Sequence, residues 1–187
     1  SPDRTTDDRP SLSLVIATLG RPGKLERALR SVTRLAVPPG ASLEVLVVDN
    51  GPSERVRALV EAFPDDGSVR FRYLREPAGG AARARNRGVD GSRGELIAFT
   101  DDDCVLEESW LEAVLNEFED APRLDVLGGR VELDDPRDAP ITVRASRERH
   151  VCEWTDVFSS VPGCNFCVRR GIFDDLGARP VGGLKAV

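Results

Sequence analysis

Short apolar runs alternate along the chain with segments whose apolar residues recur every three to four positions. The runs LSLVIAT (12–18), LEVLVVDN (43–50) and ELIAFT (95–100) are rich in aliphatic and β-branched residues, which predicts three buried strands. A further strand is predicted over VRFRYL (69–74), where the alternation of apolar and polar residues is typical of a position nearer the edge of a sheet.

Each predicted strand is followed by a segment of helical character. Residues 79–92 have the alanine and glycine content of a tightly packed helix, and the other three segments each carry apolar residues on one helix face. These faces consist of Leu25, Leu29, Val32 and Leu35, of Val56, Leu59, Val60 and Phe63, and of Leu111, Val114, Leu115 and Phe118. Strands alternating with helices predict an α/β fold with a mostly parallel, doubly wound sheet.

At 187 residues, with 40% hydrophobic and 31% charged residues, the chain has the size and composition of one globular domain. We expect residues 1–11, which are polar, to form a flexible lead-in and residues 12–187 to form the domain. The net charge of −6 argues against a nucleic-acid-binding protein. Because the sequence shows neither an apolar run long enough to span a membrane nor a signal-peptide core, we expect a cytoplasmic protein without a membrane segment.

Polar side chains follow the ends of the predicted strands, where doubly wound sheets bind their ligands. Thr18 and Arg21 follow the first strand, Asp49 and Asn50 the second, and three consecutive aspartates, 101–103, the strand over 95–100. Asp49 and Asn50 are also typical turn and cap residues, so either interpretation stands for them. Three aspartates exceed the needs of a turn, and their mutual repulsion favours a site for Mg²⁺ or Mn²⁺ that also holds a phosphate ester.

A basic cluster, Arg83, Arg85 and Arg87, precedes the strand over 95–100. It is either a solvated helix face or a source of one or two side chains that reach the phosphates. Gly79 and Gly80 allow a close approach of the backbone at the start of this helix. The chain has no Walker motif, and no dinucleotide-binding glycine fingerprint follows the first strand.

Four segments in series carry a family resemblance: LSLVIATLGRPGKLERALRSV, LEVLVVDNG, GGAARARNRGVDGSRGELIAFTDDDCVLEESWLEAVL and PGCNFCVRRGIFDDLG. In order and spacing they resemble the family 2 glycosyltransferases with the GT-A fold, over about residues 12–177. The resemblance implies inverting transfer of a sugar from a nucleotide diphosphate sugar, commonly a UDP-sugar, to an acceptor hydroxyl, with a divalent metal. The acceptor itself stays unknown.

Site roles follow from the same resemblance. It implies that Thr18 and Arg21 contact the nucleotide and that Asp49 holds its nucleobase. It also implies that Arg85, or less clearly Arg83, faces the phosphates.

The resemblance also makes Asp101 and Asp103 the Asp-x-Asp metal pair, with Asp103 the more direct ligand and Asp102 or Asp101 near the ribose. A short segment resembles the border of the donor sugar and acceptor cleft, namely Gly163, Cys164 and Asn165.

The catalytic base is the point at which the chain departs from the family pattern. In the family an aspartate of a Glu-Asp pair, some tens of residues beyond the segment matching GCNFCVRR, takes the acceptor's proton, and here only GIFDDLGARPVGGLKAV follows. We interpret Asp174 and Asp175 as surface helix residues and expect the acceptor-side portion to be missing. A truncated enzyme is favoured over a nonenzymatic or partner-dependent nucleotide-sugar-binding module. Nucleotidyl transfer is disfavoured because its glycine-rich loop is absent.

The cysteines suggest one separate hypothesis. His150, Cys152, Cys164 and Cys167 offer a histidine and three thiols, and CNFC has the two-residue gap of a zinc knuckle. Because Cys164 and Cys167 fall on a predicted strand inside a family motif, the interpretation as packing residues is favoured.

Overall fold

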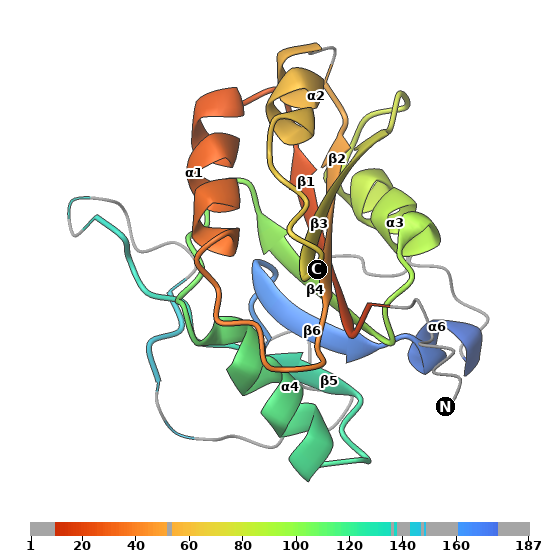
Figure 1. The fold of residues 1–187 in the computed structure, drawn as a ribbon, viewed down its shortest axis with the longest axis vertical. Helices are drawn as coiled ribbons and strands as arrows, with labels where there is room; N and C mark the ends of the chain where they lie inside the picture. The colour runs from red at the N-terminus through yellow and green to blue at the C-terminus, as the bar shows by residue number, and fades with distance from the viewer. Residues whose placement is uncertain are drawn as a thin grey trace, which may run out of the picture.

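The computed structural model describes residues 10–51, 54–135, 137, 143–146, 148 and 161–175, and within them a six-stranded sheet flanked by helices (Figure 1). The strands are β1 (Leu12–Thr18), β2 (Leu43–Asp49), β3 (Val69–Arg75), β4 (Leu96–Asp101), β5 (Val126–Gly128) and β6 (Asn165–Arg169). The helices are α1 (Pro22–Val32), α2 (Glu54–Glu61), α3 (Ala81–Gly91), α4 (Trp110–Asp120) and α6 (Gly171–Asp175). The expected lead-in, apart from its last two residues, lies outside the described residues.

The strands are ordered β3-β2-β1-β4-β6-β5. The first four are parallel, whereas β6 runs antiparallel to both β4 and β5. This confirms the predicted mostly parallel α/β sheet. The chain moves from β1 outward to β3 and then returns to the other side of β1 with β4, so a topological switch point lies between β1 and β4. Ligands of doubly wound sheets bind at the carboxyl ends of the strands beside such a point.

Two hydrophobic cores cover the two faces of the sheet. The first contains the predicted apolar faces of α1, α2 and α4, packed on alternate residues of the strands such as Leu14 and Val45. The second lies under α3 and α6 and contains the other face, including Val15 and Phe99, whose ring stacks on Phe166 at 4.6 Å between centroids. β1, β2 and β4 therefore bury both of their faces, which explains their nearly continuous apolar runs, whereas the edge strand β3 is only partly buried.

A buried carboxylate fixes α3 at the opposite edge of the sheet from the switch-point site. Glu44 on β2 accepts hydrogen bonds from Ser13 Oγ at 2.6 Å, from Arg72 Nη1 at 2.9 Å and from the backbone N–H of Arg93. Arg72 Nη1 also donates to the carbonyl of Gly91 at the end of α3. Because both oxygens of this buried group are bonded, the network joins β1, β2, β3 and α3 and holds the helix in place.

Gly88 allows α3 to pack closely on β1. A Cβ at this position would lie 2.3 Å from Cγ1 of buried Val15. We expect Gly88→Ala to lower the free energy of unfolding by about 1–3 kcal/mol, because the stiff valine cannot move aside. Gly23→Ala in α1 is the matched control. No atom lies within 4 Å of a Cβ there, and we expect a small gain of up to about 1 kcal/mol. Urea unfolding measures both values, and a gain for Gly88→Ala would contradict this packing.

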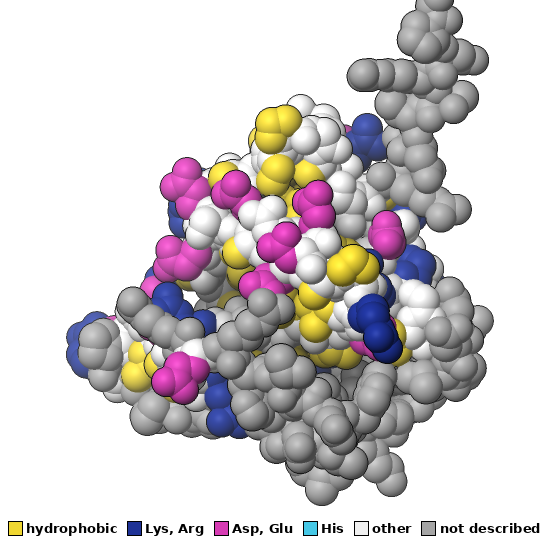
Figure 2. Space-filling model, turned by 90° about the horizontal axis from the view of Figure 1, so that it is seen from below, with side chains coloured by type: hydrophobic (Ala, Val, Ile, Leu, Met, Phe, Trp, Pro, Cys, Tyr) yellow, Lys and Arg dark blue, Asp and Glu magenta, His cyan; other side chains and the backbone are white. Residues whose placement is uncertain are grey.

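Acidic side chains gather around α4. Seen from below, the side on which α4 lies in Figure 1, several of them occupy the centre of the surface and basic ones lie toward its margins (Figure 2). The exposed acidic residues of α4 are Glu112, Glu119 and Asp120.

No helix in the described part of the chain has both the length and the apolar character needed to cross a membrane.

Candidate functional site

The ends of β1, β2 and β4 bring the predicted polar residues to one edge of the sheet. Thr18 is opposite Asp49 of β2, and Ala17 is opposite Asp101 of β4. Asp101 ends β4 and Asp102 and Asp103 follow it, so the three aspartates lie beside the end of β1, at the switch point. The gathering of these strand ends, expected from the sequence, is present in the structure.

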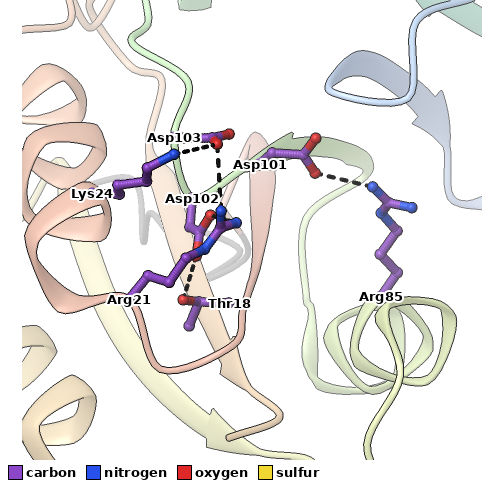
Figure 3. A network of polar contacts seen from close by, with 7 residues as sticks. All are labelled: Thr18, Arg21, Lys24, Arg85, Asp101, Asp102 and Asp103. Carbon is purple, nitrogen blue, oxygen red and sulfur yellow. Dashed lines mark hydrogen bonds and ion pairs between the residues drawn. The ribbon is translucent and has the colours of Figure 1, made fainter. Parts of the chain in front are cut away.

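Asp102 is a buried anchor between the ends of β4 and β1. It is fully buried, and Thr18 Oγ1 donates to its Oδ2 at 2.6 Å. Arg21 donates to the same carboxylate through Nε at 3.2 Å and also through Nη2 (Figure 3). Such a bidentate, charge-assisted arrangement is strong and geometrically specific. Asp102 thus fixes the relative position of β4, β1 and the loop that leads into α1.

Asp101 and Asp103 extend away from this anchor and remain partly exposed, each with 41% of its side chain accessible. Arg85 Nη2 donates to Asp101 Oδ1 at 3.0 Å, and Lys24 Nζ donates to Asp103 Oδ2 at 3.2 Å (Figure 3). Arg21 Nη1 lies 3.6 Å from Asp103 as well. The two carboxylates are therefore oriented differently from Asp102, although all three residues are adjacent in sequence.

Each of the three aspartates has a basic partner within the protein. Their repulsion, which at the sequence level favoured a cation, is thus already reduced by Arg21, Lys24 and Arg85. Lys24 was missed by the sequence analysis, although it lies three residues after Arg21, a spacing that places both on one side of a helix. Charge crowding alone consequently does not require a metal here.

The environment of Asp101 still disfavours a charge. Burial raises the pKa of its carboxyl, Arg85 opposes this effect, and Asp103 and Asp102 raise the pKa further. A carboxylate whose pKa is perturbed by burial and by specific charged neighbours is typical of functional sites. A cation or a donor group brought to Asp101 would stabilise its charged form.

Asp101 and Asp103 lie where β4 ends beside β1, and this place is called the aspartate corner. The oxygen atoms there suit a hard divalent cation. Asp101 and Asp103 offer carboxylate oxygens, the preferred ligands of Mg²⁺ and Mn²⁺. The described residues contain no group of three or more His, Cys, Asp or Glu side chains that could hold a metal. This set fits an ion that takes one or two protein carboxylates and completes its coordination with phosphate oxygens and water, as Mg²⁺ commonly does.

Asp49 is fully buried at the end of β2. Its Oδ1 accepts the backbone N–H of Gly51 at 2.9 Å, so the interpretation as a turn residue holds for this oxygen. Its Oδ2 accepts the hydroxyl of Tyr73 at 3.2 Å, and the pKa of that hydroxyl is raised by burial and by the charge of Asp49. The neighbouring Asn50 Oδ1 is buried without a partner among the described atoms, which leaves an unused acceptor beside Asp49.

The three arginines of α3 diverge. Arg85 reaches Asp101 and approaches the carbonyl of Gly163 at 3.5 Å, and its Nε is buried without a described partner. Arg83 is exposed and donates to the carbonyl of Ala78 at 3.0 Å, and Arg87 is also exposed. The structure thus directs only Arg85 to the aspartate corner.

The segment 163–165 lies beside the aspartate corner because β6 pairs with β4, with Thr100 opposite Asn165. The amide of Asn165 is engaged at both ends: Trp110 Nε1 donates to Oδ1 at 3.0 Å, and Nδ2 donates to the carbonyl of Arg130 at 2.9 Å. Asn165 therefore joins α4 to the chain that follows β5. Trp110 and Arg130 were not predicted as members of this network.

The family model described as Glycosyl transferase family 2 matches residues 13–177. The chain belongs to this family. Glycosyltransferase AglE of Haloferax volcanii is 26% identical over 177 residues, which are 94% of this chain and 58% of AglE.

Two solved glycosyltransferases have the same fold as this family 2 member. Staphylococcus aureus TarS 1–349 superimposes with a TM-score of 0.72 at 19% identity, covering 89% of this chain and 49% of TarS 1–349. The mannosyltransferase PcManGT of Pyrobaculum calidifontis, in complex with GDP-Man and Mn²⁺, gives a TM-score of 0.66 at 20% identity, covering 100% of this chain and 52% of PcManGT. The chain therefore spans about half the length of these relatives.

Three thiols of this family 2 glycosyltransferase are described, all free. A hydrogen bond with the thiol of Cys164 lowers the pKa of Cys104 to about 7, and the same contact raises the pKa of Cys164. Burial raises the pKa of Cys167 to about 12. Cys164 and Cys167 are buried, in agreement with the interpretation as packing residues, whereas His150 and Cys152 lie outside the described residues. The contact with Cys104 was not predicted.

A short helix follows β6. Asp174 and Asp175 were predicted to lie in a short helix, and α6 (Gly171–Asp175) confirms the helix. No described residue is assigned as the catalytic base.

Proposed function

We propose that this domain binds a nucleotide diphosphate sugar, specifically a UDP-sugar, with Mn²⁺ or Mg²⁺, and that it serves inverting transfer of the sugar to an acceptor hydroxyl. The observation that supports this most is the division of the three aspartates. Asp102 is buried and pairs with Arg21, whereas Asp101 and Asp103 are partly exposed and pair with Arg85 and Lys24.

The proposed roles follow from these positions. Asp103 and Asp101 would hold the cation, which when bound would neutralise the charge that develops on the departing diphosphate. Arg85 would exchange part of its pairing with Asp101 for a bidentate contact with the phosphates. Asp49 would hold the nucleobase, beside Asn50 Oδ1, which has no hydrogen-bond partner among the described atoms. Thr18 and Arg21, through Asp102, would keep the ends of β1 and β4 at the spacing that this site requires.

The solved relatives support a nucleotide diphosphate sugar as the donor, but they do not decide which nucleobase it carries. TarS has been solved in complex with UDP-GlcNAc, and PcManGT with GDP-Man and Mn²⁺. The two bound nucleotides differ, so UDP is the part of the proposal that needs a direct comparison. Mn²⁺ in one complex agrees with the hard oxygen donors at Asp101 and Asp103.

Donor turnover in this chain tests the proposed activity. We expect slow release of UDP from UDP-sugars in the presence of Mn²⁺, weaker release of GDP from GDP-mannose, and no release of either in EDTA. The measurement is a coupled assay of the liberated nucleoside diphosphate, with an Asp101→Asn, Asp103→Asn double variant as the enzyme blank. Metal-dependent binding without turnover would favour the alternative, a nucleotide-sugar-binding module without its own base. The absence of both would contradict the proposal.

A further inference from the structure

Two thiols to which the proposed transfer assigns no chemical step lie near Asp101. Cys104 lies in the loop between β4 and α4, and Cys164 directly precedes β6. Their thiol groups lie close enough for each to shift the pKa of the other, although they are separated by sixty positions in the sequence. Neither is part of a disulfide in the structure.

The pairing of β4 with β6 explains the contact. In this antiparallel register Thr100 is opposite Asn165, so the residues that continue the two strands, Asp101 and Cys164, also come close together. The chain then turns, and the backbone N–H of Cys104 donates to the carbonyl of Asp101 at 3.2 Å. This turn brings Cys104 back over Asp101 and onto Cys164. Backbone pairing thus brings the two cysteines near each other.

The two thiols differ in their access to solvent. Cys104 is partly exposed, whereas Cys164 is only 5% exposed. Cys167, two residues after Asn165 on β6, is 1% exposed, and its backbone pairs with Ala98 and Leu127. An accessible thiol that contacts a second, shielded thiol is the arrangement in which oxidation of the first is resolved as a disulfide. Cys167 provides an internal comparison, since it is a buried thiol of the same strand.

We propose that Cys104 and Cys164 are a thiol-oxidation site that forms a reversible intramolecular disulfide when the protein meets a peroxide. Cys104 sulfur attacks one peroxide oxygen and breaks the O–O bond, giving a sulfenic acid and one water. Cys164 sulfur then attacks the Cys104 sulfur and displaces the hydroxyl group as a second water. The two thiols lose two electrons and two protons in total, and hydrogen peroxide is reduced to two waters. A dithiol reductant reverses the bond by exchange.

The bond would join two loops that both contact the aspartate corner. The loop after β4 follows Asp101, which pairs with Arg85, and the segment before β6 contains Gly163, whose carbonyl lies 3.5 Å from Arg85 Nη2. The disulfide is nevertheless read directly from the protein's mass, so this inference stands or fails independently of glycosyl transfer.

Peptide mapping after peroxide treatment tests the inference. Brief exposure of the reduced chain to hydrogen peroxide, followed by alkylation and non-reducing digestion, should yield a cross-linked peptide that contains Cys104 and Cys164. This peptide should disappear on treatment with dithiothreitol. Cys104→Ser and Cys164→Ser should abolish it, and Cys167→Ala should retain it. The wild-type map decides the question if a variant fails to fold.

Thermal unfolding supplies a second measurement. A disulfide between Cys104 and Cys164 would close a long loop of the unfolded chain, so the oxidised protein should have a Tm higher by roughly 5–10 °C. Oxidation of Cys104 to sulfinic acid without formation of a cross-link would overturn the inference. A disulfide between Cys104 and a different cysteine would overturn it as well. A lower Tm in the oxidised protein would also contradict it, because it would show that bridging distorts the two loops.

Discussion

Asp102→Ala should lower the free energy of unfolding by about 3–5 kcal/mol, whereas Asp103→Ala, one residue further, should change it by less than about 1 kcal/mol. Asp102 is fully buried, and its removal leaves Thr18 Oγ1 and the guanidinium of Arg21 without their shared acceptor. Asp103 is 41% exposed and pairs with Lys24, itself 58% exposed, so its contact is screened by solvent.

Chemical denaturation of the two variants measures this difference. Thr18→Val adds a second check: because Thr18 acts through Asp102, its cost in the Asp102→Ala background should be much smaller than in the wild-type protein. Equal losses for Asp102→Ala and Asp103→Ala would show that the three aspartates are equivalent. That result would contradict the division of the triplet into one anchor and two available ligands.

Arg85→Ala should weaken UDP binding in Mn²⁺ by roughly 10- to 100-fold, while Arg83→Ala should change it by less than about threefold. The two arginines lie on the same helix two residues apart, but only Arg85 is directed at Asp101. Arg83 is exposed and bonded to the carbonyl of Ala78. A charge-assisted contact with the phosphates is lost in one variant and not in the other.

Fluorescence or calorimetric titration of both arginine variants gives the comparison, and Arg85→Lys adds a test of geometry. Lysine keeps the charge but not the bidentate fork, so we expect it to recover only part of the affinity. Similar losses for Arg83→Ala and Arg85→Ala would indicate a general effect of positive charge on α3 and would contradict a specific role for Arg85.

The sequence predicted the four parallel strands closely because burial on both faces makes the apolar runs of β1, β2 and β4 nearly continuous, while the partly exposed β3 shows the alternation of an edge strand. The predicted strand 12–18 coincides with β1, and the predicted strand 69–74 differs from β3 by one residue. By contrast, no pattern predicted the three-residue β5, whose pairing with β6 is a long-range contact. Glu44 was also missed. Glu44 is a single polar residue within an apolar run, and only the structure shows the hydrogen-bond donors, Ser13 and Arg72, that its buried carboxylate accepts from.

The candidate site could be located from the sequence but not resolved into its parts. The rule that ligands bind at strand ends selected Thr18, Asp49 and the aspartate triplet correctly as neighbours. It could not show that Asp102 is turned inward, because that orientation depends on Thr18 and Arg21 of another strand and loop. The contact between Cys104 and Cys164 was likewise out of reach, since it follows from the antiparallel register of β4 and β6.

A calorimetric titration of the wild-type chain with UDP, in Mn²⁺ and again in EDTA, tests the proposed donor site most directly. We expect saturable binding in Mn²⁺ and an affinity at least tenfold lower in EDTA, with Asp103→Asn behaving in Mn²⁺ as the wild-type chain does in EDTA. The absence of UDP binding by the folded chain in Mn²⁺, or binding that neither EDTA nor Asp103→Asn weakens, would contradict a metal-assisted nucleotide site at the end of β4.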